Sequence, residues 1–320
     1  MNIPPASPKI VFMGSPDFAL KSLVTLYDHF DVVAAFTQPD RPAGRGKELK
    51  TPAVKMLAQK LDIPIFQPQS LKDPEAVGQL KGLDPDLIVV AAYGQILRQA
   101  VLDIPKHGSI NVHASLLPRW RGAAPIQAAI LHGDTQSGVS IMRMDPGLDT
   151  GPVLSQRTIT LDAEETAGSL SDKLALLGAD LLIETLPGYL AGDIEPSEQD
   201  DELSTYAPML KKSDGELDFE NAADFLARQV RAYNPWPGTF IRLDGGMLKV
   251  HKASTLQQGK AHSGLKETIE DIPAIGTADG LLLLEKVQPA GKNPMSGADF
   301  LRGGRDWSGQ IKITKLKEKT

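Results

Sequence analysis

The sequence predicts an α/β protein in which a doubly wound, mostly parallel sheet precedes a smaller β domain. Short apolar segments rich in β-branched residues alternate with helix-like segments over the first half of the chain. Strands that are apolar on both faces are typical of a parallel sheet that helices cover on both sides. A second observation is the change to short strands with glycine-rich turns beyond residue 210.

The elements of the first domain follow from this alternation. We expect helices at residues 17–28, 51–61 and 123–132. The expected strands lie at residues 9–13, 32–36, 63–66, 87–92, 109–113 and 139–142. Active sites of open parallel sheets lie beyond the carboxyl ends of the strands, so the loops that follow the strands are the first place to look for chemistry.

The second domain is expected to be a small β-barrel. Its strands are short, and the first two are joined by a turn with two glycines, which is typical of a hairpin. The expected elements are a helix at 221–232, strands at 239–243, 248–252, 274–276 and 281–287, and a helix at 296–301. Such a pattern over about 110 residues favours a barrel over an α/β unit.

A polar segment separates the two patterns. Leucines at helical spacing predict a long amphipathic helix at residues 166–190. Residues 193–202 that follow are acidic and almost free of core residues, as in a linker. We therefore predict a first domain at residues 1–192, a linker at 193–210 and a second domain at 211–320.

Composition narrows the class of protein. The 320 residues include no cysteine, which excludes disulfides, zinc-thiolate sites and thiol nucleophiles. The amino terminus lacks a basic region followed by an apolar run, and no apolar stretch approaches the roughly 20 residues that span a bilayer. No cluster of His, Asp and Glu has metal-ligand spacing. We expect a soluble cytoplasmic monomer with no membrane partner and no metal.

Charge is unevenly distributed along the chain. The net charge is -6, which by itself argues against a nucleic-acid partner. From Lys211 onward, however, 17 Lys and Arg stand against 14 Asp and Glu, a balance of +3. The carboxyl-terminal part is therefore mildly basic, although a basic tail is usually a solvated end.

Three polar residues suggest acyl-transfer chemistry without a metal. Asn111 and His113 lie two residues apart on an expected strand, so their side chains point from the same face into one pocket. Asp149 follows in a loop after one more helix and strand. An amide and an imidazolium can hold a developing oxyanion, and a carboxylate near His113 would keep the ring charged. The alternatives are a core histidine and a turn-capping aspartate.

Two other segments carry weaker signals. Ser15 and Pro16 read as the cap and first position of a helix, and because GxGxxG is missing there, a nicotinamide cofactor is disfavoured. Residues 37–47 form a basic insertion among glycines and prolines, which fits either an RNA-binding loop or an ordinary solvated loop. In the second domain, Arg228 and Arg231 precede an aromatic segment that either packs the helix or binds RNA.

A resemblance to a known family appears once these motifs are combined. Asn111-Val112-His113, then Ser115-Leu116-Leu117-Pro118 and Arg121-Gly122, resemble the formyltransferases that use 10-formyltetrahydrofolate. Residues 36–47, 118–127 and 232–237 look like the branch of that family that formylates methionyl-tRNA. This resemblance covers essentially the whole chain. It implies a Rossmann-like formyltransferase domain and a carboxyl-terminal OB-like barrel that binds tRNA.

The resemblance also implies roles for individual residues. Asn111, His113 and Asp149 are similar to the catalytic trio of the family. The residues expected along the folate cosubstrate, 10-formyltetrahydrofolate, are Ser115, Leu116, Leu117, Pro118, Tyr93, Gly94, Gln95, Ile96, Leu97 and Asp145. Those expected to contact initiator methionyl-tRNA are Arg41, Arg45, Lys47, Arg121, Arg228 and Arg231.

The expected reaction is direct attack of the free α-amine of methionine, esterified to initiator tRNA, on the formyl carbon. The product is formylmethionyl-tRNA, which serves translation initiation. Related folate-dependent formyltransferases or hydrolases that act on a small amine or on water share the trio and stay open as alternatives. A non-catalytic RNA-binding protein is a further alternative, which the intact trio disfavours.

Overall fold

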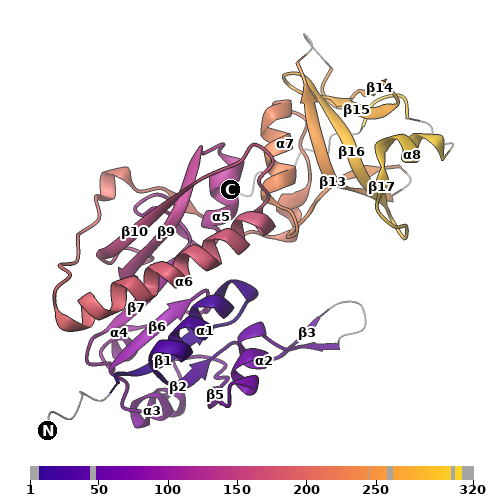
Figure 1. The fold of residues 1–320 in the computed structure, drawn as a ribbon. Helices are drawn as coiled ribbons and strands as arrows, with labels where there is room; N and C mark the ends of the chain where they lie inside the picture. The colour runs from indigo at the N-terminus through magenta and orange to yellow at the C-terminus, as the bar shows by residue number, and fades with distance from the viewer. Residues whose placement is uncertain (1–6, 44–47, 245, 258–261, 304–306, 312–320) are drawn as a thin grey trace, which may run out of the picture. The chain divides into compact units, whose positions relative to one another are not determined.

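The computed structural model describes residues 7–43, 48–244, 246–257, 262–303 and 307–311. They form two compact units (Figure 1). The first unit comprises Met1–Pro125, Gln136–Thr160 and Ser171–Ala207, and the second comprises Ile126–Thr135, Leu161–Leu170 and Pro208–Thr320. The second unit thus includes two short segments that precede the long helix or form its start.

A seven-stranded sheet forms the centre of the first unit, with the strand order β10-β9-β7-β6-β1-β2-β5. Neighbouring strands from β5 to β7 pair in parallel, whereas β9 and β10 are antiparallel to their neighbours. The bounds are β1 (Lys9–Gly14), β2 (Asp31–Phe36), β5 (Ile65–Phe66), β6 (Leu87–Ala91), β7 (Ser109–His113), β9 (Gln136–Arg143) and β10 (Val153–Thr160). The prediction of a mostly parallel sheet is confirmed.

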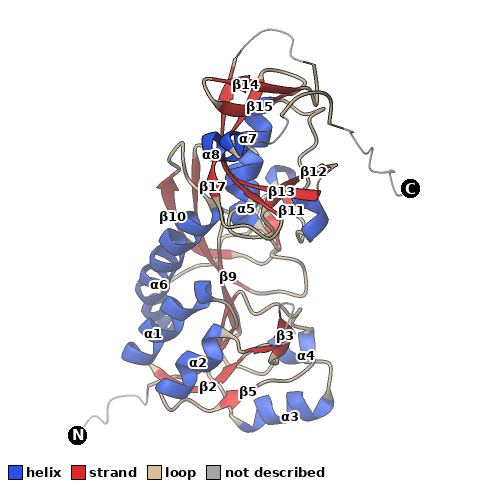
Figure 2. Cartoon of the chain, turned by 90° about the vertical axis from the view of Figure 1, so that its right-hand side faces the viewer, coloured by secondary structure: helices blue, strands red, loops and turns tan. Residues whose placement is uncertain are grey.

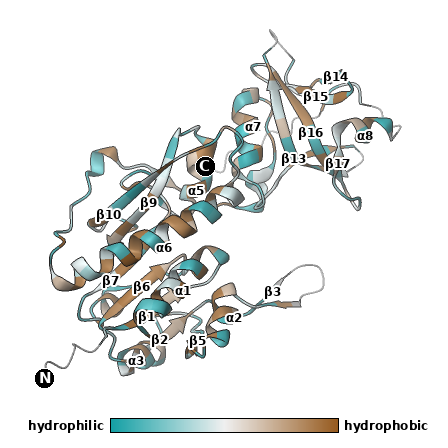
Figure 3. Cartoon of the chain, viewed as in Figure 1, coloured by the Kyte–Doolittle hydropathy of each residue, from teal (hydrophilic) through white to brown (hydrophobic). Residues whose placement is uncertain are grey.

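Helices cover both faces of this sheet. Figure 2 shows its strands between α1 and α6 on the left and α3 and α4 on the right. The helices of the first unit are α1 (Leu20–His29), α2 (Ala53–Lys60), α3 (Pro74–Gly82), α4 (Gln99–Leu102) and most of α6 (Ala167–Ala191), whereas α5 (Pro125–Leu131) lies almost entirely in the segment Ile126–Thr135 of the second unit. Every residue of β6 is buried, as a strand covered on both faces requires, and Figure 3 shows the hydrophobic strands at the centre of the sheet.

The strand order reverses between β1 and β6, because β2 lies on one side of β1 and β6 on the other. A crevice at such a switch point is the usual ligand site of a doubly wound sheet. The loops that begin at Ser15 and Ala92 leave the sheet here. The prediction that Ser15 caps a helix is wrong. Its Oγ accepts from the Gln38 N–H (3.1 Å) and donates to the Tyr93 carbonyl (3.2 Å), so it joins three loops at the switch point.

Helix α6 is long and apolar enough, by length and composition, to cross a membrane, which corrects the expectation that no stretch comes near that length. Core helices of soluble proteins pass the same test. A side chain at Gly178 of α6 would come within 2.8 Å of Val112 on β7, and this close packing on the sheet explains the apolar face of the helix.

The second unit contains an antiparallel sheet with the order β12-β13-β16-β15-β14, to which β17 adds on β16. Its core includes Leu226 and Val230 of α7 together with Val250 and Leu284 of the sheet. The bounds are α7 (Ala223–Ala232), β12 (Thr239–Leu243), β13 (Gly246–Leu256), β14 (Lys266–Ile269), β15 (Ile272–Gly276), β16 (Leu281–Pro289), β17 (Met295–Ser296) and α8 (Gly297–Arg302). The expected carboxyl-terminal β domain is confirmed.

Short strand pairs complete the fold. Strand β3 (Arg41–Ala43), within the basic insertion, pairs antiparallel with β4 (Glu48–Lys50), which directly follows the insertion. In the first unit, β8 (Arg121–Gly122) pairs in parallel with β11 (Tyr206–Ala207). The latter pair brings residues predicted as linker against the turn that follows β7.

Candidate active site

Strand β7 positions two of the three residues expected to be catalytic. Asn111 and His113 point from the same face near its carboxyl end, and the alternate residues Ile110 and Val112 are buried. His113 is opposite Ser140 of the neighbouring strand β9. Its side chain is buried, whereas Asn111 is half-buried. The strand therefore holds both groups at the edge of the core, where a ligand can reach one of them.

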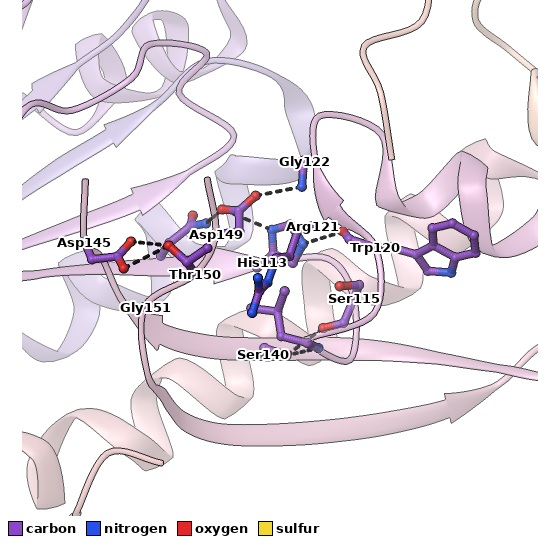
Figure 4. Close-up of polar contacts among 12 residues, drawn as sticks. His113, Ser115, Trp120, Arg121, Gly122, Ser140, Asp145, Asp149, Thr150 and Gly151 are labelled. Atoms are coloured by element: carbon purple, nitrogen blue, oxygen red, sulfur yellow. Dashed lines mark hydrogen bonds and ion pairs between the residues drawn. The ribbon is translucent and has the colours of Figure 1, made fainter. Parts of the chain in front are cut away.

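The hydrogen bonds of His113 fix the state of one ring nitrogen. Nε2 lies 3.0 Å from the backbone carbonyl oxygen of Trp120 (Figure 4). Because a carbonyl oxygen only accepts, Nε2 must carry a hydrogen and donate it. Nδ1 faces the Asp149 carboxylate, with Oδ1 at 3.7 Å. Only the Nδ1 side of the ring is then left to act on a substrate.

Asp149 connects the two strand residues to the following turn. Its Oδ2 accepts from the Gly122 N–H (2.9 Å), and its Oδ1 accepts from the Asn111 side-chain amide (3.4 Å). Its backbone has φ = 54°, in the left-handed region that an aspartate adopts at some cost. The structure thus brings all three predicted residues together around Asp149, and Figure 4 shows Asp149 beside His113. A carboxylate, an imidazole and an amide in this arrangement suit proton transfer and oxyanion stabilisation.

The turn after β7 is held by its backbone. The Ser140 hydroxyl donates to the Ser115 carbonyl (2.7 Å) and accepts from the Leu117 N–H (3.0 Å). Gln156 of β10 donates to the Leu117 carbonyl (2.8 Å). Ser115 and Leu117 are buried, whereas Leu116 and Pro118 are half-buried. The antiparallel strands at this end of the sheet therefore fix the segment expected along the folate.

The loop after β6 combines buried anchors with exposed positions. Tyr93 and Leu97 are buried in the core beneath α3 and α4. Gln95 accepts from the Leu71 N–H (3.0 Å) and donates to the Pro68 carbonyl (3.1 Å), so its side chain bonds within the protein. Gly94 is exposed with φ = 81°, and Ile96 is 77% exposed. An exposed isoleucine on a loop at the switch point is a candidate surface for an apolar ligand ring.

Asp145 shapes the loop that carries Asp149. Its carboxylate accepts from the Gly147 N–H (3.0 Å) and from the Thr150 hydroxyl (2.8 Å). These bonds close the residues 145–150 into a turn on which Asp149 sits. Asp145 is therefore close to Asp149 in sequence. In the structure, its carboxylate stabilises the turn that carries Asp149.

Sequence reasoning missed the segment that we call the strap, residues 197–207. Gln199 donates to the carbonyls of Asp149 (2.8 Å) and Gly151 (2.7 Å) and accepts from Arg121 Nε (3.0 Å). The strap reads as a polar linker, and the partners of Gln199 lie 48 to 78 residues away in sequence. No local pattern signals contacts of that range.

The residues expected to bind tRNA lie in different settings. Arg41 is exposed and donates to the Gln38 side chain (2.9 Å), whereas Arg45 and Lys47 lie outside the described residues. Arg121 is only 9% exposed and pairs with Asp201 (2.7 Å).

Both arginines of α7 are half-buried in the second unit. Arg228 donates to the Leu131 carbonyl and Arg231 to the Glu165 carbonyl, each at 3.0 Å. Burial lowers the pKa of Arg231. These side chains tie α7 to the segments 126–135 and 161–170 of the same unit, and their contact with tRNA stays a prediction. Among the described residues, no group of three or more His, Asp and Glu could hold a metal ion.

Comparisons with known proteins find formyltransferases. A family model described as formyl transferase matches residues 9–186, and one described as formyl transferase, C-terminal domain, matches residues 209–305. The methionyl-tRNA formyltransferase of Myxococcus xanthus is 48% identical over 300 residues, which cover 92% of this chain and 95% of that protein. The protein of the same name from Geobacter metallireducens is 46% identical over 297 residues, 92% of this chain and 96% of its own.

Solved structures with the same fold are more distant in sequence. An N-formyltransferase from Helicobacter canadensis, in complex with folinic acid and dTDP-3-aminofucose, aligns with a TM-score of 0.65 at 18% identity and covers 87% of this chain and 98% of its own. HypX from Aquifex aeolicus, in complex with tetrahydrofolic acid, aligns with a TM-score of 0.60 at 17% identity and covers 92% of this chain and 47% of its own. The fold, the polar trio and the two full-length relatives lead to one conclusion: the chain belongs to the methionyl-tRNA formyltransferase family.

Proposed function

We propose that this protein transfers the formyl group of 10-formyltetrahydrofolate to the free α-amine of methionine on initiator methionyl-tRNA. The observation that carries the proposal is the convergence of Asn111, His113 and Asp149 at the carboxyl end of β7. The acceptor is proposed from relatives that are 46–48% identical over more than nine-tenths of the chain and are named for this reaction.

The proposed chemistry is direct transfer. The α-amine attacks the formyl carbon, a C–N bond forms, and the carbonyl π electrons move onto oxygen. Asn111 and protonated Nδ1 of His113 donate to this oxyanion, while the Trp120 carbonyl holds Nε2–H and with it the ring. Asp149 keeps the ring oriented and passes the amine proton to the leaving folate nitrogen. The oxyanion then re-forms the C=O bond, and the bond between the formyl carbon and the folate nitrogen breaks with its electron pair left on that nitrogen. Atoms and charges balance with no other reactant.

We place the folate along the loops that meet at the switch point. The proposed contacts are Ser115, Leu116, Leu117, Pro118, Tyr93, Gly94, Gln95, Ile96, Leu97 and Asp145. The exposed Ile96 and the fixed backbone of the turn after β7 support this site. Two structural relatives with tetrahydrofolate-type ligands support the chemical class of the cosubstrate.

The proposal also covers the tRNA contacts, the division into domains, the cellular location and the oligomeric state. We place initiator tRNA against the basic insertion with Arg41, Arg45 and Lys47 and against α7 with Arg228 and Arg231. The functional division into residues 1–192, a linker at 193–210 and a tRNA-binding domain at 211–320 is part of the same proposal. Because aminoacylated tRNA is its substrate, the protein acts in the cytoplasm, and we propose that it does so as a monomer.

One alternative has a specific observation in its favour. The structural relative from Helicobacter canadensis holds a nucleotide-linked amino sugar, so a small amine is a conceivable acceptor for the same fold. That relative is only 18% identical, whereas the relatives named for tRNA match both domains at 46–48%. We therefore favour the tRNA acceptor.

The test is transfer of labelled formyl from 10-formyltetrahydrofolate to methionine-charged initiator tRNA. Methionine-charged elongator tRNA, dTDP-3-aminofucose and water serve as competing acceptors in parallel reactions. We expect label on initiator methionyl-tRNA and at least about tenfold less on each of the others. Preferential release of formate, or formylation of the amino sugar with uncharged and charged tRNA left unlabelled, would reject the assigned acceptor.

A further inference from the structure

The strap lies against both backbone segments that frame the proposed catalytic centre. On one side, the N–H of Trp120 donates to the Thr205 hydroxyl (2.8 Å), and β11 pairs with β8. On the other side, Ser197 pairs with Val153, just beyond the Asp149 loop. The strap thus bridges the turn after β7 and the loop after β9.

Gln199 is the side chain through which the strap reaches the Asp149 loop. Its single amide group donates to two carbonyls, those of Asp149 and Gly151, at 2.8 and 2.7 Å. Its carbonyl accepts from Arg121 Nε at 3.0 Å, and Arg121 pairs in turn with Asp201 of the strap. Because a guanidinium only donates, Arg121 sets the orientation of the Gln199 amide and turns its N–H groups toward the loop.

The loop that accepts these hydrogen bonds from Gln199 contains the strained backbone of Asp149. Asp149 has φ = 54°, a conformation that costs a non-glycine residue free energy and persists when surrounding contacts determine it. Two hydrogen bonds to the carbonyls at positions 149 and 151 hold this backbone on either side of Thr150. Arg121 lies next to Gly122, whose N–H donates to the Asp149 carboxylate. The strap therefore fixes the backbone and the carboxylate of Asp149 together.

We infer that Gln199, oriented by Arg121, is a positioning residue that sets the aim of Asp149 at His113. The inference rests on the proposed function for the role of Asp149, but the loop geometry it describes exists without substrate. Gln199 touches no reacting atom in this arrangement. Its loss lowers the rate by displacing a carboxylate that stands 3.7 Å from the imidazole.

Gln199→Glu is the variant that tests the positioning role most directly. It keeps the length of the side chain and can still accept from Arg121, but it places a carboxylate oxygen against two backbone carbonyls. We expect kcat for initiator methionyl-tRNA to fall about 10- to 100-fold, as for a displacement of about 1 Å, while KM for both substrates stays within about twofold. Glu198→Gln, on the exposed neighbour, is the matched control and should retain wild-type kcat. Gln199→Ala gives the same readings if Gln199→Glu does not fold.

A double-mutant cycle separates positioning from a general structural effect. If Gln199 acts through Asp149, adding Gln199→Glu to Asp149→Asn should lower kcat no further than Asp149→Asn alone. Multiplicative losses in the double variant would overturn the inference, as would a wild-type kcat in the single variant.

Hydrogen exchange of the free protein supplies a reading that does not depend on activity. We expect faster amide exchange in residues 145–153 of Gln199→Glu than in wild type and in Glu198→Gln. An inactive wild type with this exchange difference would refute the proposed function but not the contact of the strap with the loop. If wild type is active but the loop amides of Gln199→Glu exchange at the wild-type rate, the positioning role would be refuted.

Discussion

The catalytic centre and the loop after β6 both adjoin the sheet at the same end, yet they are stabilised differently. In the centre, Asn111 donates to Asp149, while His113 donates to the backbone of Trp120 and Asp149 accepts from the backbone of Gly122. In the loop 93–97, the anchors Tyr93 and Leu97 are buried among apolar side chains. Hydrogen bonds orient the side chains of the catalytic centre, whereas apolar packing fixes the position of the loop 93–97.

This difference separates the effects that substitutions should have. Replacing a centre residue removes a chemical group from a scaffold that apolar strands keep folded, so rate should fall with little change in stability. Replacing a loop anchor opens a cavity in the core, so the free energy of unfolding should fall more than the rate.

The largest effect is expected for His113→Ala. Loss of one oxyanion donor typically costs about 100- to 1,000-fold in kcat. Steady-state formylation of initiator methionyl-tRNA and thermal unfolding measure the two quantities. A kcat within a few-fold of wild type would contradict the role of the ring, and a collapse of the melting transition would contradict the contrast between the regions.

Leu97→Ala should have the opposite signature. Leu97 is 2% exposed, and truncating a buried leucine costs about 2–5 kcal/mol in the free energy of unfolding. Urea denaturation measures this loss. Assayed at a temperature where the variant is folded, kcat should stay within about tenfold of wild type. A stable variant that has lost its kcat would place Leu97 with the catalytic residues instead.

Tyr93→Phe should stabilise the protein slightly. Among the described residues, the buried Tyr93 hydroxyl has no hydrogen-bond partner, and an unpaired buried polar group costs about 1–3 kcal/mol. We expect about 1 kcal/mol more stability in urea at neutral pH. Burial raises the pKa of Tyr93, so wild type should lose more stability than Tyr93→Phe as pH rises above the ordinary tyrosine value of 10.0. A destabilised Tyr93→Phe would show that the hydroxyl is bonded in solution.

The smallest effect concerns Asp40, at the start of the basic insertion. Hydrogen bonds from Lys55 (2.6 Å) and Gln67 (3.0 Å) hold the pKa of Asp40 below its ordinary value of 3.8. The stabilisation from this carboxylate is therefore present above pH 3.8 and lost as pH falls through the lowered value. The melting temperature of wild type should exceed that of Asp40→Asn at pH 6, and the two should converge toward pH 2. A constant difference across this range would contradict the assignment.

Much of the fold was predictable because local patterns determine it. The apolar strands β1, β6 and β7 and the leucine-rich α6 appear in the sequence close to their observed bounds. Strand β10 was missed because its residues are mostly polar, and as an edge strand it needs no apolar run. The predicted cap at Ser15 is wrong because its hydroxyl bonds to neighbouring loops, contacts that only the folded chain creates.

The site shows the same limit. Asn111 and His113 were predictable because two residues on one strand share a face, and Asp149 because it is a carboxylate in the loop after the next expected strand and matches the catalytic trio of the family. The closeness of Asp149 to them depends on a left-handed backbone and on Gln199, 50 residues further along. The burial of Arg121 against the strap and its ion pair with the exposed Asp201 depend on contacts of similar range, which the sequence did not indicate, and its contact with tRNA stays a prediction.

The central claim is that the three polar residues form one catalytic unit, and Asp149→Asn tests it most directly. This variant keeps an acceptor for the Gly122 N–H but removes the charge beside the imidazole. With 10-formyltetrahydrofolate and initiator methionyl-tRNA both bound at saturation, we predict that single-turnover formyl transfer is at least about 100-fold slower than in wild type. Transfer at the wild-type rate would contradict the claim.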